Sequence, residues 1–318
     1  MGIYHKLYPY LRNPHKMCER SALKTLLKKK DSMDKIEFIK DKFKIDLGYE
    51  LDLDNPKTFN EKMQWLKFFN QRKDLNIMAD KHLVKRYVSD IIGQEHIATE
   101  YGAWNKFDEV DFTKLPKSFV MKTNHGCGSM FVCKDKTKFA DFSFLKVDFT
   151  KSLESNYYDN YFEYPYRDIK PMIIAEEFLS DGVNKVLPVF KFFCFGGKPF
   201  VAQIIQNDKQ DNETIDSIDM DYNFLRISQG YPNSKKSKRL PKPKLFEQMK
   251  EYASKLSQGF PFLRVDLYDC GDKIIFSEFT FFSDAGFARF FPKKWDYILG
   301  QKIELPNYKI IENQKYDR

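Results

Sequence analysis

The stretch that decides the fold is residues 263–281, LRVDLYDCGDKIIFSEFTF. It predicts two strands joined by a turn at residues 270–272, because polar and apolar side chains alternate on both sides of that turn. This alternation places Arg264 and Asp266 on one face of the first strand, and Glu278 on one face of the second. The chain should therefore contain an antiparallel strand pair with a charged face.

The polar side chains of this strand pair suit a metal site. If the strands pair across the turn, Asp266 and Glu278 are opposite or diagonal neighbours within reach of one cation. Two carboxylates and the hydroxyl of Thr280 are hard oxygen ligands of the kind that Mg²⁺ prefers, with room left for phosphate oxygens. Arg264 beside them could stabilise a phosphoryl group during its transfer. A plain salt bridge at the edge of a sheet is the alternative interpretation.

A second candidate site surrounds Lys122. Strand-like runs at 118–123 and 130–134 flank residues 124–129, NHGCGS, a loop too long and too rich in small residues for a two-residue hairpin turn. Phosphate binding needs a rigidly held positive charge and backbone N–H groups that turn inward. The spacing excludes a Walker A loop, in which the lysine follows the glycines and precedes a helix. A hairpin with a lysine beside it is the alternative.

A third candidate is residues 176–179, EEFL, where the chain leaves a predicted buried strand. An extended segment of this kind can offer backbone N–H and C=O groups to the edge of an adenine ring, between apolar neighbours. An ordinary acidic strand end is the alternative.

Weaker patterns are set against these three. Asp219-Met220-Asp221 and residues 52–54 have the Asp-x-Asp form with which a glycosyltransferase holds a metal, but such triplets arise by chance among 45 acidic residues. His125 could be a base or a phosphate donor, although a lone loop histidine is more often a polar turn residue. The five histidines show no paired spacing, which argues against a His-ligated metal.

Length and composition limit the class of protein. A chain of 318 residues should form about two globular units, and 31 Phe and 18 Tyr predict aromatic-rich cores. No apolar run approaches the roughly 20 residues of a membrane-spanning helix. The N-terminus also lacks a signal-peptide pattern, so we expect a cytoplasmic protein. The five cysteines are too widely spaced for a zinc site or a disulfide framework, which predicts reduced, buried thiols.

The net charge of +8 is compatible with several polyanionic partners: nucleic acid, anionic lipid, a nucleotide or an acidic glycan. A solvated basic surface with no partner is the simplest alternative. Residues 18–44 predict a basic, amphipathic helical leader, which either packs on the body of the protein or lies on a membrane surface.

The rest of the chain predicts a mixed α/β protein built from α+β layers. A capping box, Thr58 with Glu61, opens a helix that reaches about residue 69, and a second helix runs from about 77 to 89. The polar stretch 206–244 should be a long surface excursion. Further strands and a helix are expected at 189–195, 200–205 and 244–257.

The order of these motifs resembles the ATP-grasp superfamily. The resemblance rests on residues 119–128 (FVMKTNHGCG), 174–179 (IAEEFL), 264–266 (RVD) and 278–280 (EFT). More narrowly, the chain is similar to the TupA-like branch, which is associated with teichuronopeptide and capsular polysaccharide clusters. The motifs that carry this are FNEKMQWL (59–66), ADK (79–81), KFFCF (191–195) and GFPF (259–262), within a resemblance that covers about residues 55–300.

The resemblance implies an ATP-grasp fold, in which two α+β subdomains clamp ATP and follow a helical N-terminal part. The implied divisions are a basic leader at 1–45, a helical part at 46–115, a small subdomain with the glycine-containing loop at 116–180, and a metal-binding subdomain at 181–318.

The resemblance also implies a role for each candidate residue. ATP would be bound by Lys81, Lys122, His125, Gly126, Gly128, Ser129, Glu176, Glu177, Phe178, Leu179 and Lys191. Mg²⁺ would be bound by Asp266, Glu278 and Thr280, while Arg264 and Lys122 would act on the transferred phosphoryl group. The acceptor substrate would contact Ser283, Asp284 and Gly286.

Two positions and one segment depart from the family pattern. Thr280 stands where many ATP-grasp sequences have Asn, and it is a weaker third metal ligand. Val189 stands where the branch has an acidic residue that contacts ribose. Residues 282–286, FSDAG, replace a segment of Thr-Pro-Gly-Ser-Gly character, which predicts an unusual choice of acceptor.

By this resemblance the chain is expected to be an ATP- and Mg²⁺-dependent carboxylate–amine ligase of bacterial surface polysaccharide synthesis. It would join an amino acid to a uronic acid through an acyl phosphate. The partners would be an acidic sugar or glycan carboxylate and an amine, with no nucleic acid. The alternatives are a glycosyltransferase that holds a nucleotide sugar with Asp219 and Asp221, and a non-catalytic nucleotide-binding or membrane-surface scaffold.

Overall fold

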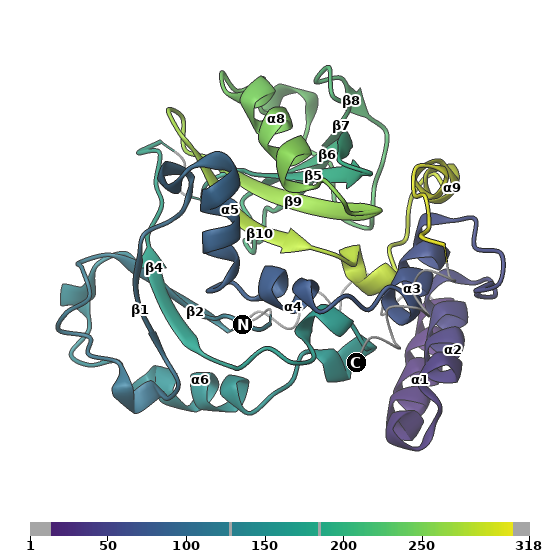
Figure 1. Cartoon of the computed structure of the whole chain (residues 1–318), viewed down its shortest axis with the longest axis horizontal. Coiled ribbons are helices and arrows are strands. Elements are labelled where there is room, and N and C mark those ends of the chain that lie inside the picture. Colours follow the sequence, from purple (N-terminus) through teal and green to yellow (C-terminus); the bar gives the residue numbers. More distant parts are fainter. Residues whose placement is uncertain (1–13, 127–128, 184–185, 308–318) are drawn as a thin grey trace.

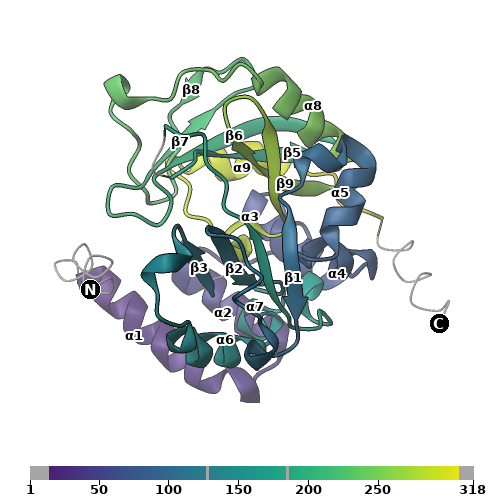
Figure 2. The same ribbon diagram turned by 90° about the vertical axis from the view of Figure 1, so that its left-hand side faces the viewer.

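The computed structural model describes residues 14–126, 129–183 and 186–307, and within these ranges it contains two antiparallel sheets. In both views the smaller sheet lies below the larger one (Figures 1 and 2), and helices α1 and α2 lie toward the lower end of the molecule. The mixed α/β class and the helical N-terminal part are therefore as predicted.

Two helices of the N-terminal half, α2 and α3, begin at side-chain caps. The Asp34 side chain accepts hydrogen bonds from the N–H groups of Ile36 and Glu37 at the start of α2. Thr58 and Glu61 form the predicted capping box at the start of α3. The bounds are α1 Pro14–Lys29, α2 Lys35–Leu47, α3 Phe59–Phe69, α4 Asp74–Ala79 and α5 Val84–Ile92.

The single helix predicted at 77–89 is wrong, because residues 80–83 separate α4 from α5. Asp80 Oδ1 accepts a hydrogen bond from the N–H of His82 at 2.8 Å, a local bond that competes with helix formation. The interruption matters for the site described below, since it presents Lys81 outside a helix.

The smaller sheet has the strand order β1-β4-β2-β3. Phe119, Met121 and Ala175 belong to a buried cluster on one of its faces, together with Phe149 of α6. β1 is not predicted from the sequence, because Gly102 and a β-bulge next to Glu100 disturb its alternation. The bounds are β1 Glu100–Trp104, β2 Phe119–Thr123, β3 Met130–Cys133, β4 Ile173–Glu177, α6 Lys146–Leu153 and α7 Tyr158–Tyr161.

The larger sheet has the strand order β10-β9-β5-β6-β7-β8. Phe190 and Phe192 of β5 pack on Phe246 of α8, with ring centroids 6.2 and 5.9 Å apart, so α8 covers one face. Phe59 of α3 packs on Phe262 at 5.0 Å and covers one end of the other face. The bounds are β5 Val189–Phe195, β6 Lys198–Gln206, β7 Thr214–Ile218, β8 Phe224–Leu225, α8 Phe246–Leu256, β9 Phe262–Asp269, β10 Ile274–Thr280 and α9 Lys294–Gln301.

The surface excursion predicted at 206–244 is partly wrong, since β7 and β8 lie within it. β7 is not predicted from hydropathy because a carboxylate lies on its buried side. Asp216 is only 2% exposed, and it accepts hydrogen bonds from the N–H and the hydroxyl of Ser234. A buried carboxylate that is paired in this way is compatible with a sheet interior.

Cys133, Cys194 and Cys270 are free and buried, as predicted, while the side chains of Cys18 and Cys127 lie outside the described part. Burial raises the pKa of the Cys194 thiol to about 12. Among the described residues no helix is long and apolar enough to cross the hydrocarbon core of a membrane. A membrane contact of the leader and the division of the chain into four parts stay predictions.

Candidate functional site

The smaller sheet turns a partly charged face away from its own core. Lys122 lies directly opposite Met130 of β3 and Ile174 of β4, and Val120 lies opposite Glu176. Side chains of directly opposite residues share a face. This face therefore carries Val120, Lys122, Met130, Val132, Ile174 and Glu176.

Glu176 bridges two lysines on this face. Its Oε2 lies 2.5 Å from Lys122 Nζ and its Oε1 lies 2.7 Å from Lys85 Nζ of α5. Burial would raise the pKa of the Glu176 carboxyl, but Lys122 and Lys85 lower it below its ordinary value. Burial would likewise lower the pKa of Lys122, but Glu176 raises it. Lys122 is thus a charged side chain held in one position.

We expect Glu176→Gln to destabilise the protein by about 3 kcal/mol at neutral pH, because the mostly buried Lys122 loses its carboxylate and Lys85 keeps only Glu100. The folded-state pKa of Glu176 is lowered, so the contribution is complete above the unfolded pKa and is lost as the pH falls through the folded pKa. Urea unfolding of wild type and variant should show a stability difference that narrows in acid. A difference independent of pH would contradict this assignment.

The connection between α4 and α5 holds the loop that follows β2. The Lys81 N–H donates to the carbonyl of Asn124 at 3.1 Å, and Lys81 Nζ donates to the carbonyl of Gly126 at 2.6 Å. Asn124 Nδ2 in turn donates to Asp80 Oδ2 at 3.0 Å. Lys81 therefore lies beside the loop that was predicted to close over phosphates.

The other predicted loop residues have different placements. The carbonyl of Ser129 accepts from the Thr123 N–H at 3.3 Å and closes the hairpin. Gly128 lies outside the described residues. His125 is only 3% exposed, and its Nε2 lies 3.1 Å from the carbonyl oxygens of both Ser152 and Ser155. A phosphate contact through Nε2 would require the ring to leave both carbonyls, so its placement favours packing over ligand binding.

Residues 177–179 cross from the smaller sheet to the larger one. Glu177 Oε1 lies 3.9 Å from Lys273 Nζ, next to β10. Lys134 Nζ lies 5.6 Å from the centre of the Phe178 ring. Leu179 packs against the buried cluster of Leu187, Cys270 and Ile275. The predicted adenine-binding segment is thus the link between the two sheets.

The larger sheet carries the predicted acidic pair. Glu278 lies directly opposite Asp266, and Thr280 lies opposite Arg264, with a β-bulge between Phe276 and Glu278. Lys191 of β5 lies opposite Asp266 on its other side. The pairing of these strands, predicted from alternation alone, is confirmed.

Arg264 and Asp266 form a two-point ion pair. Arg264 Nε and Nη2 donate to Asp266 Oδ1 and Oδ2 at 2.8 and 2.7 Å. Lys191 Nζ lies 3.3 Å from Asp266 Oδ2, and Glu278 Oε1 lies 3.5 Å from Arg264 Nη2. Burial lowers the pKa of Arg264, but Asp266 raises it well above its ordinary value. The guanidinium is therefore permanently charged and fixed in orientation.

The charges of the two sheets act on each other. Desolvation by the surrounding protein would raise the pKa of Glu278, yet Lys81, Lys191, Arg264 and Lys122 together lower it. Lys122 belongs to the smaller sheet and Glu278 to the larger, so the two charged faces meet in one region. We call it the inter-sheet site: Lys81, Lys122, Glu176, Lys191, Arg264, Asp266 and Glu278.

Several residues of this region are not predicted from the sequence. Lys85 is not among the predicted residues, although Lys81 and Lys85 are four positions apart, as neighbours on a helix face are. Met130 and Val132 share the face of Lys122 and are 43% and 39% exposed. Exposed apolar side chains beside a lysine that could bind phosphate are suited to pack on the flat ring of a nucleotide base. Their alternation with the buried Cys133 was a signal that could have identified them.

The predicted acceptor residues separate into two groups. Ser283 Oγ lies 3.5 Å from Arg264 Nη1, and the exposed Asp284 lies next to it in the chain. Gly286 instead faces α3, where its carbonyl accepts from Gln64 Nε2 at 2.8 Å. Ser283 and Asp284 thus border the inter-sheet site, whereas Gly286 has a packing role.

We expect Gly286→Ala to destabilise the protein by about 2–3 kcal/mol, which lowers the melting temperature by about 5 °C. A Cβ on Gly286 would lie 2.6 Å from Gln64 Nε2 and 3.0 Å from Met63 Cβ, at a backbone φ of +73°. Gly271→Ala is the matched control, because its φ is +85° but no atom lies within 4 Å of the added Cβ. Equal losses in both variants would show that only the backbone angle matters.

Solved structures of several ligases are similar to this chain. The chain is similar to D-alanine–D-alanine ligase from Bacillus anthracis complexed with ATP, with 14% identity, a TM-score of 0.36, and coverage of 64% of this chain and 55% of that one. It is similar to D-alanine–D-alanine ligase from Helicobacter pylori, with 17% identity, a TM-score of 0.39, and coverage of 77% and 69%.

For the L-amino acid ligase from Bacillus licheniformis the identity is 14%, the TM-score 0.36, and the coverage 66% of this chain and 42% of that one. The chain thus spans little more than half of the Bacillus anthracis ligase. The comparison with curated proteins gives no match. Residues 61–304 match the family described as TupA-like ATPgrasp, and the chain belongs to this family.

Proposed function

We propose that this chain is an ATP-dependent carboxylate–amine ligase. The observation that supports it best is the arrangement of two charged faces: Glu176 holds Lys122 on the smaller sheet, Asp266 lies opposite Glu278 on the larger one, and the charges of Lys122 and Glu278 act on each other. A triphosphate needs cations on one side and a metal-binding carboxylate on the other, and the inter-sheet site offers both. Membership of the TupA-like ATP-grasp family supports the same proposal.

The reaction would proceed in two steps. The bond between the β–γ bridging oxygen and the γ-phosphorus breaks, a carboxylate oxygen forms a bond to that phosphorus, and ADP leaves. An amine then attacks the acyl carbon, loses a proton, and releases inorganic phosphate as the amide forms. In the first step negative charge develops on the leaving ADP, and in the second it develops on the acyl oxygen and the leaving phosphate, so fixed cations lower both barriers.

The residues of the inter-sheet site divide this work. Lys122, held by Glu176 at 2.5 Å, and Lys81, beside the Gly126 carbonyl, would bind phosphate oxygens. Arg264 is oriented by two hydrogen bonds to Asp266 and would contact the transferred phosphoryl group. Because these partners fix the cations before a substrate arrives, little reorganisation is needed during the reaction.

Asp266 and Glu278 fit a Mg²⁺ ion. They lie opposite each other on neighbouring strands and offer hard carboxylate oxygens. Among the described residues no group of three or more His, Cys, Asp or Glu could hold a metal alone, which is compatible with an ion that takes its other ligands from phosphates and water. Asp266 Oδ1 accepts a hydrogen bond from Arg264 Nε and has a second lone pair for the ion, whereas Oδ2 is shared by Arg264 Nη2 and Lys191 Nζ. When bound, the ion would neutralise phosphate charge.

The substrates we propose are an acidic sugar or glycan carboxylate and an amino acid, joined during synthesis of a bacterial surface polysaccharide at the cytoplasmic side of the membrane. The net charge of +8 suits an acidic glycan. We also propose that Thr280, which lies opposite Arg264, is the third protein ligand of the Mg²⁺ ion.

The glycosyltransferase alternative is disfavoured by the position of its metal ligands. Asp219 Oδ1 accepts hydrogen bonds from the N–H groups of Asp221 and Asn223 at 3.0 and 2.8 Å. These bonds close the turn between β7 and β8, while Asp266 and Glu278 lie on β9 and β10 at the other edge of the sheet. Asp219 thus has a local structural role.

A thermal-shift panel tests the proposal against this alternative. MgATP at about a hundred times its Kd should stabilise the wild type by about 2.7 kcal/mol, because it binds only the folded state. UDP-sugars should have no effect, and Asp219→Ala should respond to MgATP as the wild type does. A UDP-sugar shift that disappears in Asp219→Ala would favour the glycosyltransferase instead.

A further inference from the structure

The segment after β10 has an unusual backbone. Asp284 and Ala285 have φ of +49° and +53°, and Gly286 follows with +73°. We call residues 283–288 the strap. Consecutive non-glycine residues in the left-handed region cost about 1 kcal/mol or more each, and they persist where the surroundings impose them. The question is which residues impose this conformation.

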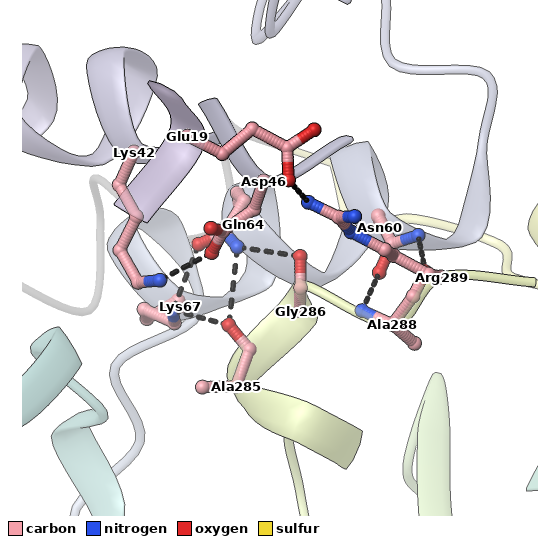
Figure 3. Close-up of polar contacts among 10 residues, drawn as sticks. All are labelled: Glu19, Lys42, Asp46, Asn60, Gln64, Lys67, Ala285, Gly286, Ala288 and Arg289. Carbon is pink, nitrogen blue, oxygen red and sulfur yellow. Dashed lines mark hydrogen bonds and ion pairs between the residues drawn. The ribbon is translucent and has the colours of Figure 1, made fainter. Parts of the chain in front are cut away.

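The polar face of α3 holds the strap (Figure 3). Asn60, Gln64 and Lys67 are each 0% exposed, and their spacing places them on one side of the helix. Gln64 Nε2 donates to the carbonyls of Ala285 at 3.1 Å and Gly286 at 2.8 Å. The Gln64 side chain thus fixes the carbonyls of two residues in the left-handed region.

Lys67 and Asn60 form further hydrogen bonds to the strap. Lys67 Nζ donates to the Ala285 carbonyl and to Gln64 Oε1, both at 2.8 Å. Asn60 bonds Ala288 twice, donating to its carbonyl and accepting from its N–H, both at 2.9 Å. Burying a lysine has a large desolvation free energy unless hydrogen bonds or a charge compensate it. An apolar residue at this position would avoid that free-energy cost. The polar stripe therefore has a purpose other than packing.

The strap leads from α3 to the inter-sheet site. Ser283 Oγ lies 3.5 Å from Arg264 Nη1, and the exposed Asp284 accepts a hydrogen bond from Gln229 at 3.4 Å. Arg289, just beyond the strap, is paired with Glu19 of α1 at 3.1 Å (Figure 3). The strap is therefore fixed at its Ala285–Ala288 part, and its Ser283–Asp284 part stands beside the arginine that we place at the phosphoryl group.

We infer that Asn60, Gln64 and Lys67 are positioning residues, which hold the strap in its left-handed form and so set Ser283 and Asp284 against Arg264 where the acceptor substrate binds. This inference rests on the proposed function. It concerns the acceptor side of the site alone, so nucleotide binding should not depend on the three residues.

The test compares Lys67→Met with Lys62→Met in the full chain. Both lysines belong to α3, but Lys62 Nζ donates to the Ile303 carbonyl at 2.7 Å and leaves the strap untouched. Hydrogen exchange at the amides of Ala285, Phe287 and Ala288 should accelerate about tenfold or more in Lys67→Met only. The Kd of MgADP should change by less than about twofold in both variants.

Turnover and rescue complete the test. With MgATP and a mixture of uronic acids and amino acids, Lys67→Met should lower kcat for ADP release by about tenfold, with KM for ATP unchanged. Adding Ala285→Gly to Lys67→Met should slow the amide exchange and raise kcat, each by about threefold or more. The reason is that glycine adopts a positive φ without a steric penalty. Unchanged exchange in Lys67→Met, no recovery with Ala285→Gly, or an equal effect of Lys62→Met would overturn the inference. A wild type that does not bind MgADP would instead refute the proposed function.

Discussion

Glu278→Gln should lower the rate of ADP formation by about a hundredfold to a thousandfold. The substitution keeps the shape of the side chain and removes the charge that faces Lys81, Lys191, Arg264 and Lys122. A neutral amide is a much weaker ligand for Mg²⁺ than a carboxylate. The Glu278 side chain keeps 35% of its surface exposed, so the fold should tolerate the change. Initial rates of ADP release at saturating MgATP measure the effect.

Glu247→Gln is the matched control for this prediction. The Glu247 side chain of α8 is 65% exposed and its carboxylate lies 2.7 Å from both Lys242 Nζ and Lys250 Nζ, outside the inter-sheet site. Its rate should stay within about threefold of the wild type, as for a surface carboxylate with no chemical role. If Glu278→Gln keeps wild-type activity, Glu278 is not a metal ligand in this reaction.

Lys122→Met should weaken the binding of MgATP by about 3 kcal/mol, or about a hundredfold in Kd. The methionine retains most of the apolar stem but removes the ammonium that Glu176 holds at 2.5 Å. A phosphate oxygen would then lose a fixed, charged donor, and Glu176 would keep only Lys85 as its partner. Isothermal titration with MgATP and with MgADP measures the loss.

Lys85→Met separates ligand binding from stability. Lys85 supports the same carboxylate as Lys122, at 2.7 Å, but belongs to α5 and was not assigned to the nucleotide. We expect a destabilised protein whose Kd for MgATP changes by less than about threefold. Equal losses of affinity in Lys122→Met and Lys85→Met would indicate that both act through the position of Glu176.

The β9–β10 pair and the hairpin around Lys122 are predictable from the sequence because each has a clear alternation and a turn of defined composition. Asp266 and Glu278 consequently fall opposite each other as expected. This register is predictable because it depends only on residues within one hairpin, which are close in the sequence. That the charges of Lys122 and Glu278 act on each other across two sheets depends on the tertiary structure, which no local pattern contains.

The failures of sequence reasoning have physical causes too. The stripe of Asn60, Gln64 and Lys67 is typical of a solvated helix face, yet all three are buried because the strap supplies carbonyls to them. His125 looks available in a polar loop, but two backbone carbonyls near the end of α6 occupy its ring nitrogen. In both cases the partner is distant in sequence and is a backbone group, so it leaves no trace in residue type.

A crystal structure of the full chain with a non-hydrolysable ATP analogue and Mn²⁺ in place of Mg²⁺ tests the central claim most directly. We predict an anomalous peak between the carboxylates of Asp266 and Glu278, and phosphate oxygens within hydrogen-bonding distance of Lys122 Nζ. A nucleotide bound elsewhere, at the Asp219 turn for example, with Lys122 and Glu278 both free of it, would contradict the account.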